Sequence, residues 1–273
     1  MDRIRKALDL ARQDRARLFE TEANGSHTVE AKPVAKQPPG FIEYTKTVVY
    51  APRPELLESN RIVNPSQSDP AAAAFRMLRT QVLQRMDSRG WRSVAVLSPN
   101  ANDGKTTTAI NLAISLANDH RHTVLLVDCD LKQPAIAATL GISPIVGLND
   151  VLCGKAQVEQ CLYHPDGFER LVVLPASAGL DNSSEALSGP RGRELVAELR
   201  ERYPERIILY DLPPIMGADD ALAFLPLIEC GLMVVAEGAT RREDLLRCME
   251  LVSKTPIVGT VLNRSSTVTS AYG

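Results

Sequence analysis

Apolar and polar positions alternate along residues 93–262 in blocks that predict strands and helices in turn. Short continuous apolar runs at 94–97 and 122–127 predict strands that are buried on both faces. Similar runs predict strands at 171–174, 206–210, 232–236 and 257–262. Apolar residues at helical spacing predict helices at 70–86, 105–116, 147–154, 190–202, 219–229 and 241–252. This alternation predicts an α/β fold with a doubly wound, mostly parallel sheet.

The same pattern divides the chain into four segments. Residues 1–20 predict an amphipathic helix, and its interleaved acidic residues favour a solvated or partner-docking helix over one that lies on a membrane. Residues 21–65 contain six prolines and predict an extended, partly disordered linker, with a β-branched patch at 44–50 that could pair locally. Residues 66–265 form the predicted nucleotide-binding domain, in which 177–189 is expected to be a polar loop, and 266–273 a flexible tail.

Composition excludes several classes of protein. The 273 residues carry a net charge of −2 and a pI near 6.1, which gives no reason to expect nucleic acid as a partner. The five cysteines and four histidines show no metal-ligand spacing, so metal binding through these residues and triad chemistry are not expected. No apolar run approaches 18 residues, so we expect no direct membrane span and a cytoplasmic protein.

The segment 98–106, SPNANDGKT, separates a predicted strand from a predicted helix. Backbone N–H groups in the first helical turn are unpaired and favour an anion such as a phosphate. Gly104 permits close approach, Lys105 can reach the β- and γ-phosphates, and the Thr106 hydroxyl can ligate Mg²⁺. Pro99 stands where the standard pattern has a glycine, whereas Asn102 tolerates a positive φ. The segment predicts an ATP-binding P-loop, and the alternative is a helix start that carries Lys and Thr incidentally.

Three aspartates follow predicted strands. Asp128 and Asp130 come after the strand at 122–127, and Asp211 ends the strand at 206–210. Ligands of parallel sheets gather at the carboxyl ends of strands, where a carboxylate can hold Mg²⁺. A turn or helix cap before Pro134 is the alternative for the first pair, although a cap needs only one carboxylate.

The three motifs SPNANDGKTTTAINLA, LLVDCDLKQP and IILYDLPP resemble, in this order, the Walker A, A′ and B motifs of the bacterial tyrosine kinases of capsular and exopolysaccharide biosynthesis. The resemblance covers residues 65–264 and includes PAAAAFRMLRT, SSEAL and GTVLNR. It implies a P-loop NTPase of the deviant Walker type. The N-terminal RIRKALDLARQ resembles the opening of soluble members, which work beside a separate transmembrane chain-length or co-polymerase protein.

The resemblance also implies residue roles. ATP would contact seven residues, of which Asn263 lies near the adenine: Asn102, Asp103, Gly104, Lys105, Thr106, Thr107 and Asn263. Mg²⁺ would be held by Thr106, Asp128 and Asp211. The catalytic residues would be Lys105, Asp128, Asp130 and Asp211, with Asp128 or Asp130 helping to deprotonate the acceptor hydroxyl. Arg76 and Arg79 match arginines that form rings in the family, which implies a homo-oligomer; a solvated basic face is the alternative.

The sequence departs from the family at four places. The loop has Asn102 where the family has a glycine, and the ring motif has Ala73 where the family has glutamate. Lys132 replaces the arginine of the A′ motif, which keeps the charge without the bidentate fork. The C-terminal tyrosine cluster is reduced to Tyr272, which is either a single phosphosite or an inert tail residue.

Three functions compete. The first is an ATP-dependent autokinase that regulates polysaccharide biosynthesis and export at the inner face of the membrane, held there by its partner. The second is a nucleotide-switched scaffold for that partner, without kinase activity. The third is a partition or cell-division ATPase, which the sequence disfavours because Asn100 stands where those ATPases have their signature lysine.

Overall fold

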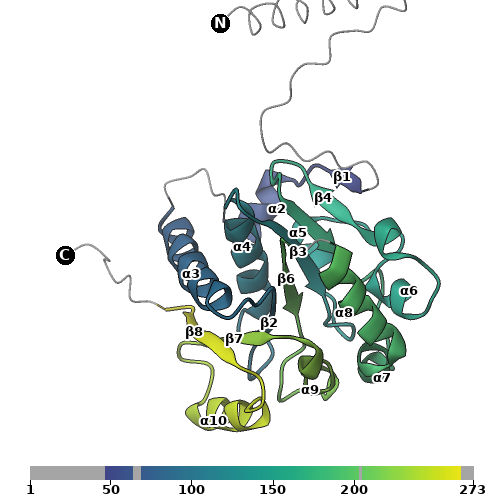
Figure 1. The fold of residues 1–273 in the computed structure, drawn as a ribbon. Coiled ribbons are helices and arrows are strands. Elements are labelled where there is room, and N and C mark those ends of the chain that lie inside the picture. The colour runs from purple at the N-terminus through teal and green to yellow at the C-terminus, as the bar shows by residue number, and fades with distance from the viewer. Residues whose placement is uncertain (1–46, 64–68, 203–204, 266–273) are drawn as a thin grey trace, which may run out of the picture. The chain divides into compact units, whose positions relative to one another are not determined.

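The computed structural model describes residues 47–63, 69–202 and 205–265 (Figure 1). The predicted helix at 1–20, the linker up to residue 46 and the tail at 266–273 with Tyr272 lie outside these residues. Across the described ranges, no helix is both long and apolar enough to cross a membrane.

An eight-stranded sheet forms the centre of the described residues, in the order β1-β4-β5-β3-β6-β2-β7-β8. All neighbours pair in parallel except β4 and β5. The strands are β1 (Val48–Tyr50), β2 (Ser93–Leu97), β3 (Thr123–Asp128), β4 (Tyr163–Pro165), β5 (Leu171–Leu174), β6 (Arg206–Asp211), β7 (Cys230–Ala236) and β8 (Ile257–Asn263). The predicted mostly parallel sheet is confirmed, and all six predicted strands are present.

Helices cover both faces of this sheet (Figure 1). They are α2 (Pro54–Ser59), α3 (Pro70–Asp87), α4 (Lys105–Ala117), α5 (Ile136–Leu140), α6 (Leu148–Leu152), α7 (Ser183–Ser188), α8 (Pro190–Arg202), α9 (Asp220–Phe224) and α10 (Arg242–Leu251), with short 3₁₀ turns at Val158–Cys161 and Leu225–Leu227. Apolar residues of α3, α4 and α5 pack in one core, and those of α6 to α10 pack in the other. The doubly wound arrangement is therefore confirmed.

Successive side chains of β3 pack alternately into the two cores. Val124 and Leu126 join the core beneath α4, whereas Leu125 and Val127 join the core on the opposite face. Successive side chains of a strand point to opposite faces, so a strand buried on both sides must be apolar throughout. The strand ends at Asp128, the first residue that this environment cannot accept without a polar partner.

The linker prediction is wrong for residues 47–63. β1 pairs in parallel with β4, more than a hundred residues later, and not locally. Pro54 stands at the start of α2, a position that proline tolerates because no intrahelical N–H bond is lost there. Asn111 of α4 accepts a hydrogen bond from the Val63 amide at 2.7 Å and donates to the Arg61 carbonyl at 2.9 Å. These contacts attach the segment to the domain.

The structure differs from two further predictions of secondary structure. The polar stretch at 177–189, predicted as a loop, contains α7, which buries Ser183 and Leu187. The helix predicted at 219–229 is shorter, because Pro226 lies in a 3₁₀ turn that follows α9. Helix α5 is not predicted by the sequence pattern, and its Ile136 and Leu140 complete the core beside α4.

Candidate active site

The Asp103 carboxylate makes hydrogen bonds within the loop between β2 and α4 and to a residue outside this loop. One carboxylate oxygen accepts the Asn100 amide at 2.9 Å, and the other accepts the Thr240 hydroxyl at 2.8 Å. Asn102 and Gly104 both adopt left-handed backbone conformations, with φ of 64° and 89°. The asparagine thus takes a conformation that a glycine would adopt most easily, because Asn tolerates this region better than most residues.

The end of β8 holds the same loop from the other side. The Asn263 side chain donates to the Asp103 carbonyl at 2.9 Å, and the Arg264 guanidinium donates to the Asn102 carbonyl. A Cβ atom on Gly104 would collide with the Asn263 side chain. Asn263 therefore lies against the loop backbone.

Lys105 opens α4 and its side chain is buried. Its Nζ atom donates to Asp211 Oδ1 at 2.8 Å and to the Thr106 hydroxyl at 3.3 Å, and it lies 3.8 Å from Asp130 Oδ2. Burial opposes the ammonium charge, but the carboxylates of Asp211, Asp130 and Asp128 together outweigh that effect and raise the pKa of Lys105. The lysine is therefore a fixed positive charge at the base of the loop.

Asp128 and Asp211 lie side by side because they are register partners on the neighbouring strands β3 and β6. Both residues are fully buried. Asp128 Oδ2 accepts the amides of Ala135 and Ile136 at 3.1 and 3.0 Å. Asp128 Oδ1 and Asp211 Oδ2 are buried without a hydrogen-bond partner in the described part of the chain. Burial, reinforced by the Asp211 charge, raises the pKa of Asp128 to about 7.

These two oxygens fit a hard cation. Mg²⁺ takes oxygen ligands, and it is usually held by one or two carboxylates with water and substrate phosphates completing its shell. Within 47–63, 69–202 and 205–265, no group of three or more His, Cys, Asp or Glu side chains could hold a metal ion. A Mg²⁺ ion at Asp128 and Asp211 would therefore need the Thr106 hydroxyl and the nucleotide as further ligands.

Asp130 lies in a turn just beyond β3 and is partly exposed. Its Oδ1 atom accepts the Gln133 amide at 3.2 Å, while Oδ2 faces Lys105. Burial raises the pKa of Asp130, and the Lys105 charge opposes that rise. The three predicted carboxylates and Lys105 are thus brought together at the carboxyl ends of two neighbouring strands.

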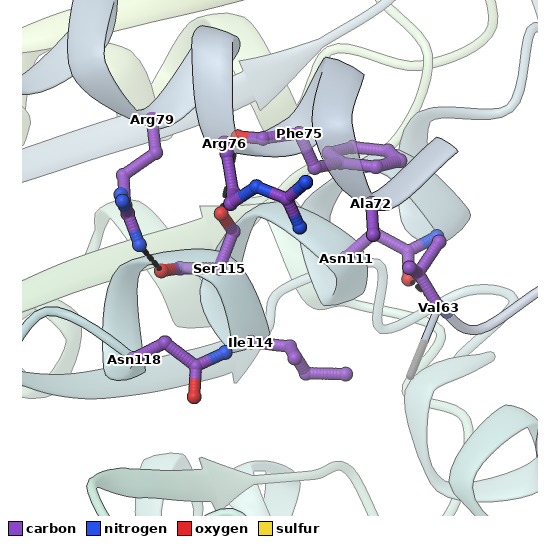
Figure 2. A pocket seen from close by; sticks show the side chains of 9 residues that line it. All are labelled: Val63, Ala72, Phe75, Arg76, Arg79, Asn111, Ile114, Ser115 and Asn118. Carbon is purple, nitrogen blue, oxygen red and sulfur yellow. Dashed lines mark hydrogen bonds between the residues drawn. The ribbon is translucent and has the colours of Figure 1, made fainter. Parts of the chain in front are cut away.

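The other predicted residues are placed as follows. Thr107 lies partly buried in the first turn of α4. Arg76 and Arg79 lie on α3, where they line a pocket of about 160 Å³ between α3 and α4 (Figure 2). Arg79 donates to the Ser115 carbonyl of α4 at 3.0 Å, whereas Arg76 is exposed. These arginines are not part of the carboxylate cluster.

Thr240 is a site residue that the sequence does not reveal. It lies in the turn after β7, 137 residues beyond Asp103 along the chain, and also accepts the Ala236 amide. No local motif surrounds it. Only the pairing of β7 with β2 brings its hydroxyl to the loop.

The loop with two left-handed residues joins a strand to a helix that begins with a buried lysine, next to carboxylates at the ends of two strands. This combination defines a P-loop nucleotide-binding protein. Residues 92–225 match the family model described as an AAA domain. The tyrosine-protein kinase YwqD of Bacillus subtilis is 29% identical over 191 residues, which are 69% of this chain and 79% of YwqD. The crystal structure of the VpsO kinase domain superposes with a TM-score of 0.64 at 32% identity, covering 72% of this chain and 96% of that domain. The chain belongs to the bacterial tyrosine kinase family.

A longer relative is the succinoglycan biosynthesis transport protein ExoP of Rhizobium meliloti. It is 28% identical over 212 residues, which are 76% of this chain. The chain spans only 26% of the length of ExoP.

Proposed function

We propose that this protein is an ATP-dependent tyrosine autokinase that regulates the biosynthesis and export of a surface polysaccharide. The observation that carries the proposal is the pair of buried, unpartnered carboxylate oxygens of Asp128 and Asp211 beside Lys105. A buried carboxylate oxygen without a hydrogen-bond partner costs free energy, so its presence here favours a ligand that would bind to it. The name of the relative ExoP supports the polysaccharide role.

ATP would lie with its phosphates against the backbone amides of the loop and the first turn of α4, where the unpaired N–H groups and the helix dipole favour negative charge. The residues concerned are Asn102, Asp103, Gly104, Lys105, Thr106 and Thr107, with Asn263 nearby at the loop backbone. Lys105 neutralises phosphate charge. Thr106, Asp128 and Asp211 would hold Mg²⁺, which supplies further charge neutralisation when it is bound.

In the reaction, the phenolic oxygen of a tyrosine forms a bond to the γ-phosphorus. The bond from that phosphorus to the bridging oxygen breaks, and ADP leaves with the electron pair. The phenolic proton passes to Asp130 or Asp128. Asp130 is the better placed of the two, since its side chain is 14% exposed whereas Asp128 is fully buried.

The partner we propose is a transmembrane protein of the chain-length or co-polymerase class. The role in the name of the relative ExoP, transport in succinoglycan biosynthesis, supports a partner of this class. The kinase would then be cytoplasmic and peripheral to the inner face of the membrane. We also propose that Arg76 and Arg79 contribute to a homo-oligomer.

Intact-mass analysis after incubation with Mg²⁺ and ATP tests the kinase proposal. The wild-type protein is expected to gain the mass of at least one phosphoryl group, and Lys105→Ala is expected to gain none. Tyr272→Phe tests whether the tail tyrosine is the acceptor. Lys254→Met is the matched control, because Lys254 is exposed and precedes β8, at the end of the sheet opposite the loop.

A wild-type protein that gains no mass contradicts the kinase proposal. If it nevertheless binds ATP, the nucleotide-switched scaffold replaces it. The partition-ATPase alternative has little support, because the Asn100 side chain is a neutral amide that donates to Asp244 at 3.0 Å and carries no positive charge toward the phosphates.

A further inference from the structure

A second buried carboxylate, Asp220, lies outside the cluster described above. It is the first residue of α9, and its side chain is only 2% exposed. Its Oδ2 atom accepts Lys132 Nζ at 2.9 Å, and its Oδ1 atom accepts the Ser183 hydroxyl of α7. One carboxylate therefore joins α9, α7 and the turn that follows β3.

Lys132 is two residues beyond Asp130 in that turn. The Gln133 amide bonds to both the carbonyl and the carboxylate of Asp130. Leu131 is fully buried, and its carbonyl accepts the Leu180 amide at 2.8 Å. Lys132 therefore attaches the turn to α9 through Asp220, in addition to the buried side chain of Leu131.

The charges on this pair depend on each other. A buried carboxylate is tolerated only when it is paired and hydrogen-bonded, and both oxygens of Asp220 are. Burial opposes ionisation of Asp220, but the Ser183 hydroxyl and Lys132 outweigh it and lower its pKa. The hydrogen bond from Lys132 to Asp220 raises the pKa of Lys132, so both groups are charged near neutral pH.

We propose that Lys132 and Asp220 are positioning residues that hold the turn carrying Asp130 opposite Lys105. In the described part of the chain, the side chains of Lys132 and Asp220 make no hydrogen bond or ion pair with the loop or with the first turn of α4. They would therefore control the transfer step and not the binding of nucleotide. This inference rests on the proposed kinase function, with Asp130 as an acceptor-side group.

The alternative is that Asp220 only ties α7 to α9. Helix α7 has a second tie of that kind, because Ser184 donates to Asp219 at 3.0 Å. A role confined to these two helices would not involve Lys132, whose side chain is 44% exposed. The Lys132 variants therefore separate the two explanations.

The experiment compares Lys132→Met, Asp220→Asn and Lys132→Arg with the control Lys254→Met in the full chain. Three quantities are measured: the Kd for ATP, the rate of phosphoryl incorporation at saturating Mg²⁺ and ATP, and amide hydrogen exchange of residues 129–135. In Lys132→Met and Asp220→Asn, the rate is expected to fall about 100-fold, as misplacement of a reacting group by roughly 1 Å can cause. The Kd for ATP should stay within about twofold, and exchange in the turn should increase.

Lys132→Arg keeps the charge and a donor, so its rate and turn protection should stay close to wild type. The double variant of Lys132→Met and Asp220→Asn should lose little more than either single variant, because both remove the same contact. The proposal is overturned if Lys132→Met leaves rate and exchange unchanged, or if ATP binding weakens in parallel with the rate. If Asp220→Asn fails to fold, Lys132→Met decides.

The two proposals fail differently. A wild-type protein without phosphoryl incorporation contradicts the kinase function and with it the effect on transfer, whereas hydrogen exchange in the turn still shows whether the pair holds the turn. An active wild type with unaltered exchange and rate in Lys132→Met contradicts the positioning role alone.

Discussion

Gly104 and Asn102 carry the backbone conformation of the phosphate loop. Both have a positive φ, and a side chain at Gly104 would also meet that of Asn263. Asn102 shows that the altered loop keeps its left-handed turn, with the asparagine in the place of the family glycine. Gly104 is therefore restricted both by its positive φ and by the Asn263 side chain.

Gly104→Ala is predicted to weaken ATP binding strongly and to lower the free energy of unfolding. A Cβ at φ 89° costs about 1–2 kcal/mol by itself. It would also push Asn263 away from the Asp103 carbonyl. Calorimetric titration with ATP and denaturant unfolding measure the two effects.

Gly90→Ala is the control for this substitution. Gly90 has φ 68°, but a Cβ added there would meet no atom within 4 Å, so only the backbone cost should appear. Equal ATP affinity in Gly104→Ala and wild type would contradict the crowding argument.

Among the elements, β1 and α2 show most clearly how tertiary contacts override a local signal. Proline content indicates a linker, yet Ile62 is buried in the core beneath α3 and α4. Asn60 also donates to the Thr139 carbonyl at 2.9 Å, next to the end of α5. The segment is held by residues far away in the chain, which no local pattern encodes.

Ile62→Ala is predicted to lower the free energy of unfolding by about 2–4 kcal/mol, because a buried isoleucine leaves a cavity when truncated. Val49→Ala is the control, since Val49 is 55% exposed and its truncation should cost no more than about 0.5 kcal/mol. Urea unfolding of both variants measures the difference. Equal midpoints would mean that the segment does not contribute to the core.

At the scale of the whole molecule, the proposed homo-oligomer is the property that an experiment should test. Arg79 is bonded to the Ser115 carbonyl within its own chain, so part of its role is to pack α3 on α4 (Figure 2). Arg76 is exposed on the same helix, at the edge of the pocket. The two arginines should therefore respond differently to truncation.

Arg76→Ala is predicted to reduce the molar mass of the proposed assembly in light scattering while the melting temperature of the protein stays unchanged. Arg79→Ala should also lower the melting temperature, since it removes the bond between α3 and α4. A wild-type protein that remains monomeric over a wide concentration range would contradict the oligomer proposal.

Motifs with a local physical cause can be predicted from the sequence. Apolar runs that end in aspartate predict β3 and β6 with Asp128 and Asp211, because burying a charged side chain in the middle of such a strand would cost free energy. The loop before α4 is predicted because Gly104, Lys105 and Thr106 stand between a strand and a helix. Right-handed crossovers favour a parallel sheet, in which the ends of β3 and β6 lie together.

Contacts between distant residues require the folded chain. Thr240 reaches Asp103 across 137 positions, and Lys132 reaches Asp220 across 88. Such pairs have no periodicity and no fixed spacing, so their partners become visible only when strands and helices are packed together. Secondary structure and the chemistry at strand ends are local consequences of residue type, whereas the support of the loop and of the turn carrying Asp130 depends on how the whole sheet is assembled.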